Sequence, residues 1–286
     1  MGRKGNGPRT LMNLIIETAE LPGYERYESQ EVITMKKVGL LKSLAALLAV
    51  GMLMVPSLVA AATYNLESDW SNTLNPNGTW AFWQGGTVLP AQTGGFAATQ
   101  IGASNYFAPS PNSGNFLPIW WQEGSPPISG LATGIVYTHS VDSANGNPAL
   151  GQSAVTWTSP VAGTIDVSLT IWYAQLGEQR SDDFSLYLGG YSAGVQSGTQ
   201  LTSGTVNYNT LYYDQAHAFT FTDNGLTVGK DGVLSLVVSR TLGETFGTEA
   251  GVILNITETP VPAPASLLLL APGFVGLAAM RRRFKK

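Results

Sequence analysis

The stretch GTIDVSLTIWYAQ, residues 163–175, limits the fold of this chain more than any other. Five of its large apolar residues occupy every second position, at Ile165, Val167, Leu169, Ile171 and Tyr173. Because successive side chains of a strand point to opposite faces, this pattern predicts a strand with one buried and one wet face. An amphipathic helix would instead place its apolar residues three and four positions apart.

Similar short runs recur through residues 63–258, separated by Gly, Asn, Pro and Ser. The clearest are GIVYTHS, SAVTWTS, FSLYLGG, AHAFTFT, VLSLVVS and GVILNIT. Their spacing is close to the ~8–12 residues typical of sandwiches and barrels. We therefore predict an all-β domain over residues 63–258, a two-sheet antiparallel β-sandwich with jelly-roll-like connectivity. An immunoglobulin-type sandwich is the alternative.

Three segments of this domain carry local expectations. Residues 103–130 are rich in Ser, Pro, Asn and Gly, which predicts a long surface excursion with one short strand. The turn residues Asn224-Gly225 and Lys230-Asp231-Gly232 are expected to divide the last strands into hairpins.

The charge of the predicted domain excludes one class of partner. Residues 63–258 carry three basic residues against fourteen acidic ones, a formal balance of −11. Such a surface repels phosphate backbones, so no nucleic acid is expected to bind. The chain has no cysteine, which excludes disulfides and thiolate metal sites.

Residues 35–62 have the layout of a secretory signal peptide. Basic residues come first, an apolar stretch follows, and small residues end the segment, so a signal helix with cleavage near Ala61 or Ala62 is predicted. We interpret residues 1–34 as an upstream extension, either an incorrectly assigned start or a disordered segment. The alternative is a cytoplasmic extension ahead of an uncleaved membrane anchor.

The C-terminal residues predict a transmembrane helix. Residues 266–280 form an apolar run of 15, at the short end for a bilayer, which takes ~17–25 residues. A basic end follows, in which Arg281, Arg282 and Arg283 would act as the membrane-anchor stop on the cytoplasmic side. A hydrophobic helix docked on the sandwich is the alternative.

The order of a proline step, an apolar helix and a basic end over residues 259–286 resembles the PEP-CTERM sorting signal of Gram-negative bacteria. Val261, Pro262, Ala263 and Pro264 stand where that family has Val-Pro-Glu-Pro, with Ala263 at the Glu position. The resemblance implies an exosortase-like sorting enzyme as partner and transient residence in the inner membrane. It also implies a final place at the cell surface or in the extracellular matrix.

Residues 64–258 also resemble the domains that precede such tails. The resemblance rests on Asp69-Trp70-Ser71, on residues 75–80 (NPNGTW), on the strand SAVTWTSP and on the final strand GVILNITET.

The sequence contains few residues that could carry out acid–base catalysis or bind a metal ion. His139 and His217 are the only histidines, and no catalytic residue is predicted. His217 is expected in a strand, because it alternates with two phenylalanines. Glu178, Asp182 and Asp183 form the densest acidic cluster and could hold calcium, which prefers several oxygen ligands. The other interpretations of this cluster are a solvated loop or a glycosidase acid–base pair. No other cofactor is expected.

Aromatic residues supply the candidate binding site. Exposed aromatic rings stack on the apolar faces of sugars, and polar neighbours bind the hydroxyl groups. Trp120 and Trp121 are adjacent, so in a strand one of them must point outward, and Gln122 would be its polar partner. These three residues are the predicted glycan contacts.

The sequence thus predicts an exported, non-enzymatic surface or matrix protein that associates with exopolysaccharide. A structural surface protein without a glycan ligand is the first alternative. A secreted carbohydrate-active enzyme is the second.

Overall fold

Two antiparallel sheets dominate the computed structural model, which describes residues 60–111, 118–127, 130–142, 152–175, 177–192, 194–208 and 214–261. The large sheet contains, in spatial order, β14 (Phe219–Val228), β9 (Gly163–Tyr173), β16 (Glu249–Pro260), β7 (Val136–His139), β6 (Ile119–Gln122), β5 (Asn105–Phe107) and β4 (Ala91–Thr93), and β1 (Ala62–Asn65) also pairs with β16. The small sheet contains β13 (Thr199–Asn207), β10 (Ser181–Leu188), β15 (Val233–Arg240), β8 (Ser153–Thr158), β2 (Trp80–Gln84) and β3 (Thr87–Val88). Three short elements complete the description: a hairpin of β11 (Tyr191–Ser192) and β12 (Val195–Gln196), the helix α2 (Gly95–Ile101) and the 3-10 turn η2 (Gln215–His217).

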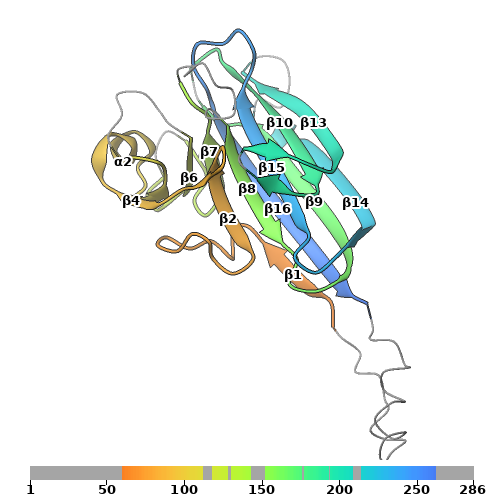
Figure 1. Cartoon of the computed structure of the whole chain (residues 1–286). Helices are drawn as coiled ribbons and strands as arrows, with labels where there is room; N and C mark the ends of the chain where they lie inside the picture. Colours follow the sequence, from red (N-terminus) through yellow and green to blue (C-terminus); the bar gives the residue numbers. More distant parts are fainter. Residues whose placement is uncertain are drawn as a thin grey trace, which may run out of the picture. The chain divides into compact units, whose positions relative to one another are not determined.

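The chain alternates between the sheets from β7 to β10 and again from β13 to β16 (Figure 1). The resulting orders β14-β9-β16-β7 and β13-β10-β15-β8 are the interleaving that two Greek keys give in a jelly roll. The prediction of a two-sheet antiparallel sandwich is therefore confirmed.

The main core fills the space between the two sheets. The alternation in β9 is confirmed, because Ile165, Val167, Leu169, Ile171 and Tyr173 all lie in this core, whereas Trp172 points to the outer face. Phe82 of the small sheet stacks on Phe107 of the large sheet, with ring centroids 5.1 Å apart, and lies 5.4 Å from Trp120. Aromatic contacts of this kind add to the burial of apolar area that drives the sheets together.

A second layer covers the outer face of part of the large sheet. The prediction for residues 103–130 is wrong, because β5 and β6 extend the large sheet there. Their outward side chains are buried in a separate cluster: Ile101, Ala103, Tyr106, Ala108, Ile119, Trp121, Leu131, Tyr137 and Trp172. α2 contributes to this cover and ends at Ile101, and the next residue, Gly102, has a φ of 68°, the left-handed conformation that glycine adopts readily.

One row of this outer cluster crosses four strands. Trp121 pairs with Tyr137, Tyr137 with Gly251, and Gly251 with Trp172, so the four residues lie side by side on the same face. The absent side chain of Gly251 leaves the space that the Trp172 indole fills, since a Cβ there would lie 2.3 Å from two indole carbons.

The motif residues of 69–80 act as a structural brace. Asn75 donates to the carbonyl oxygens of Phe82 (2.9 Å) and Leu89 (2.7 Å) and accepts from the Phe82 amide at 2.9 Å. Asp69 accepts from the Trp80 indole at 3.1 Å. These side chains satisfy buried backbone and indole groups, which explains the motif without a ligand.

The two turn signals have different roles from those expected. Asn224-Gly225 lies inside β14 as a bulge, where the register against β9 shifts between Asp223 and Leu226. The turn at Lys230-Asp231-Gly232 joins β14 to β15, which belong to different sheets. It is therefore a connection across the sandwich rather than a hairpin.

Both ends of the described sandwich lie together, at the lower right of Figure 1. Ala62 of β1 pairs with Glu258 of β16, and the Val261 amide donates to the Ala162 carbonyl oxygen. The predicted extension, signal helix and transmembrane helix fall almost wholly on residues 1–59 and 262–286, outside the described residues. No helix within the described ranges is long and apolar enough to cross a bilayer.

Replacing Gly251 with alanine tests the packing of Trp172. We expect Gly251→Ala to lower the free energy of unfolding by about 1–3 kcal/mol, because the indole must move away from the new methyl group. Urea unfolding followed by tryptophan fluorescence measures this. Gly229→Ala is the matched control, since its Cβ would meet nothing within 4 Å. Equal stability of the two variants would contradict the packing described.

Candidate functional site

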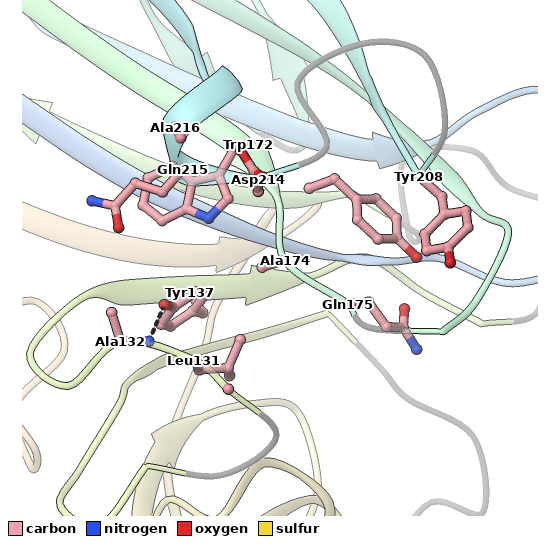
Figure 2. Close-up of a pocket in the computed structure, with 12 residues that line it drawn as sticks. Leu131, Ala132, Tyr137, Trp172, Ala174, Gln175, Tyr208, Asp214, Gln215 and Ala216 are labelled. Atoms are coloured by element: carbon pink, nitrogen blue, oxygen red, sulfur yellow. Dashed lines mark hydrogen bonds between the residues drawn. The ribbon is translucent and has the colours of Figure 1, made fainter.

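A cleft of about 610 Å³ opens where β9 ends (Figure 2). Segments far apart in the sequence meet here: the loop before β7, the end of β9, the end of β13 and the turn η2. The described residues that line the cleft are Gly130, Leu131, Ala132, Tyr137, Trp172, Tyr173, Ala174, Gln175, Tyr208, Asp214, Gln215 and Ala216. Its volume lies within the ~300–1,000 Å³ typical of small-ligand sites.

Aromatic side chains form much of the wall. Trp172 points to the outer face of the large sheet and meets Tyr137 edge to face, with centroids 6.3 Å apart. Tyr173 points to the opposite face and meets Tyr208 at 5.8 Å. Two adjacent residues of β9 can both reach the cleft because the strand ends there. Figure 2 shows Trp172 toward one end of the cleft and Tyr208 toward the other.

Polar groups alternate with these rings. The Gln175 Oε1 accepts from the Thr248 hydroxyl at 3.0 Å, and the Tyr137 hydroxyl accepts from the Ala132 amide at 2.9 Å. Burial raises the pKa of Tyr137 and of Tyr173 to about 12, so both phenols are uncharged at neutral pH.

Asp214 is half-exposed and caps η2. Its Oδ1 accepts from the backbone amide of His217 at 2.8 Å and lies 2.7 Å from the His217 Nδ1. The hydrogen bond from the His217 side chain lowers the pKa of Asp214, so this carboxylate remains ionised at neutral pH.

Buried ionisable groups lie directly behind the cleft. Asp182 Oδ1 accepts from the Ser140 hydroxyl at 2.8 Å and from the Thr248 amide at 3.3 Å, and burial raises its pKa well above the usual value. Burial, together with nearby Glu123, raises the pKa of Glu249 to about 7. Burial also lowers the pKa of His139, which favours the neutral imidazole.

The predicted glycan contacts are not exposed. Trp120 and Trp121 do point to opposite faces of β6, yet both have 0% exposure. Trp120 lies in the main core, and the outer cluster around α2 covers Trp121. The half-buried Gln122 donates to the carbonyl oxygens of Glu67 and Gly134. The expectation of an open tryptophan in this strand is therefore wrong.

The predicted calcium ligands do not converge. Asp182 and Asp183 are neighbours in β10, so Asp182 points inward while Asp183 accepts from Thr205 on the other face. Glu178 lies 3.7 Å from Arg180. No group of three or more His, Cys, Asp or Glu residues in the described part of the chain is arranged to hold a metal ion. His217, expected in a strand, lies in η2.

The remaining predicted residues belong to the sorting signal. Val261 is exposed at the end of the sandwich. Pro262, Ala263, Pro264, Arg281, Arg282 and Arg283 lie outside the described residues.

Sequence reasoning missed the cleft because its residues are distant in the chain. The one local signal was the dipeptide Trp172-Tyr173 at the end of the clearest strand, where aromatic residues on both faces can meet solvent. Tyr208, Gln175 and Asp214 carry no pattern that connects them to β9.

Comparison with known proteins found similarities of structure alone. No protein-family model and no curated protein matches the chain, so the PEP-CTERM resemblance of residues 259–286 stays a prediction. The K1 cleaved adhesin domain of Lys-gingipain from Porphyromonas gingivalis is similar with a TM-score of 0.34 and 11% identity, over 71% of this chain and 99% of that one.

Two carbohydrate-binding modules are also similar. The C-terminal CBM6 of LamC, a marine laminarinase from Zobellia galactanivorans, has a TM-score of 0.24 and 15% identity, over 48% of this chain and 90% of that one. A CBM36 module in complex with calcium and xylotriose has a TM-score of 0.26 and 13% identity, over 50% and 91%. At these values, functional conclusions depend on the residues of this chain itself.

The buried carboxyl of Glu249 predicts a pH-dependent stability. Its folded-state pKa of about 7 exceeds the ordinary 4.5, so folding retains a proton. The stabilisation is therefore complete below pH 4.5 and is lost as the pH rises through about 7. Between pH 4.5 and 8 we expect the wild type to lose roughly 3 kcal/mol more of its free energy of unfolding than Glu249→Gln.

Urea unfolding at a series of pH values measures this difference. Glu178→Gln, which removes a half-exposed carboxyl group, is the control variant. Identical pH profiles for wild type and Glu249→Gln would show that Glu249 is not held uncharged.

Proposed function

We propose that this chain is an exported, non-enzymatic surface protein that associates with polysaccharide through the cleft at the end of β9. The observation that carries the proposal is the combination of aromatic walls and polar groups around one cavity of about 610 Å³.

The lining suits the two-sided chemistry of a sugar ring. The C–H face of a pyranose is apolar and packs on an aromatic ring, for which the half-buried Tyr208 is available. Trp172, 4% exposed, supports the wall from behind. The hydroxyl groups need donors and acceptors, which Gln175, Gln215 and Asp214 supply. The hydrogen bond from Thr248 orients Gln175, which reduces the entropy lost on binding.

The position of the cleft supports a surface role. In the pairing of β9 with β16, Gly163 lies opposite Pro260 and Tyr173 lies opposite Ala250. The chain thus enters and leaves near the Gly163 end, whereas the cleft lies at the Tyr173 end, about 33 Å away along the strand. Attachment through either end of the sandwich, as the predicted sorting signal requires, would involve none of the residues that line the cleft.

The lining also favours binding over hydrolysis. Glycosidases place two carboxyl groups about 5–9 Å apart across the scissile bond. Among the described residues that line this cleft, Asp214 is the only acid. A carbohydrate-active enzyme would need a second carboxyl group from elsewhere.

Loss of an aromatic wall should weaken binding. We expect Tyr208→Ala to raise the Kd for a bound polysaccharide at least about fivefold, because a ring that packs on sugar is removed. Affinity electrophoresis of the full chain in gels containing soluble polysaccharides measures this. Tyr187→Ala is the control, since the Tyr187 hydroxyl donates to Gln200 on the small sheet away from the cleft. If the polysaccharide retards Tyr208→Ala as strongly as Tyr187→Ala, the proposal is contradicted.

Export and sorting predict two processing events. Intact-mass analysis of fractionated cells should find a surface or released form that begins near Ala62. That form should lack the basic C-terminal end when the exosortase-like enzyme is present and retain it when the enzyme is absent. Full-length chain with both ends uncut in the cytosol would contradict this part of the proposal.

A further inference from the structure

We propose that the cleft selects its glycan by charge, accepting uncharged sugars and rejecting uronates; this inference rests on the proposed function. The class of ligand is thus a neutral polysaccharide rather than an acidic one. The cleft contains one carboxylate, and the arginine and lysine side chains of the described sandwich are engaged in other contacts or lie far from it.

Asp214 supplies the only formal charge among the described residues that line the cleft. Its carboxylate is half-exposed, and the hydrogen bonds from His217 reach its Oδ1 from within η2. A uronate carboxylate that entered the cleft would therefore meet a like charge, and no lining side chain would offer it a counter-ion.

The nearest arginine is already engaged. Arg180 donates to the Gly247 carbonyl oxygen at 3.2 Å and lies 3.7 Å from both Asp142 and Glu178. Its guanidinium also stacks over the Phe246 ring at 4.8 Å from the centroid. Turning Arg180 toward a ligand would cost all of these contacts at once.

Arg240 and Lys230, the other two Arg and Lys residues of the described sandwich, are also unable to reach a ligand in the cleft. Arg240 donates to the carbonyl oxygens of Asp142 and Thr245, at 3.1 and 2.7 Å. Lys230 follows β14, whose last residue Val228 pairs with Gly163, so it lies near the opposite end of β9 from the cleft. That separation of about 33 Å is several times the screening length of about 8 Å at physiological ionic strength. The electrostatic potential in the cleft is therefore negative.

Oligosaccharides that differ only in charge test this proposal. Hexamers of glucose and of glucuronate, each in β-1,4, β-1,3 and α-1,4 linkage, are titrated against the full chain by calorimetry. In the linkage that binds, we expect glucose hexamer to bind at least about fivefold more tightly than glucuronate hexamer in 50 mM salt. Raising the salt to 500 mM should narrow that ratio, because exposed charges are screened.

The variant Asp214→Asn tests whether the Asp214 carboxylate causes the discrimination against glucuronate. Asparagine also caps helical turns well, so η2 should be preserved while the charge is lost. We expect the ratio of the affinity for glucose hexamer to the affinity for glucuronate hexamer to fall about two- to fivefold, because glucuronate hexamer binds more tightly. Asp231→Asn is the matched control: it changes the net charge equally, in the turn beside Lys230, and asparagine tolerates its φ of 63°. Its ratio should equal that of the wild type.

The outcomes separate the two proposals. Equal or tighter binding of glucuronate by the wild type would overturn charge selection and leave the glycan-binding proposal standing. An unchanged ratio in Asp214→Asn would overturn the role of Asp214. Binding of none of the hexamers would overturn both proposals.

Discussion

The pairing of β9 with β16 is the constraint on which the rest of the sandwich depends. It runs without interruption from Tyr173 opposite Ala250 to Gly163 opposite Pro260. One end of this pairing holds β1 beside β16, where the chain enters and leaves. The other end places Trp172 and Tyr173 at the cleft. A single long antiparallel register therefore decides both where the domain can be held and where it can bind.

The cleft end is stabilised by contacts that also position its polar groups. Thr248 connects the two sheets, since its amide donates to Asp182 of β10 and its hydroxyl donates to Gln175, just after β9. Ala174 is fixed by its amide, which donates to the Glu249 carbonyl oxygen at 2.8 Å. Burial raises the pKa of both Asp182 and Glu249, so these carboxyl groups behind the cleft stay uncharged to a higher pH than exposed ones.

The sequence predicted what depends on local alternation. The buried face of residues 163–173, the all-β class and the two-sheet arrangement all followed from period-two patterns and turn residues. The burial of Trp121 could not be predicted in this way, because α2 and the loop before β7 cover it from elsewhere in the chain. The cleft was missed for the same reason: alternation shows which face of a strand is apolar, but not which distant segment meets the end of that strand.

Hydrogen–deuterium exchange of the full chain, with and without a bound neutral polysaccharide, tests the central claim most directly. We expect slower exchange on binding in peptides that contain Trp172 to Gln175, Tyr208 and Asp214 to Ala216. Peptides at the opposite end, around Lys230 and Val261, should exchange at unchanged rates. Slower exchange confined to that opposite end or to the outer strands β13 and β14 would contradict the account.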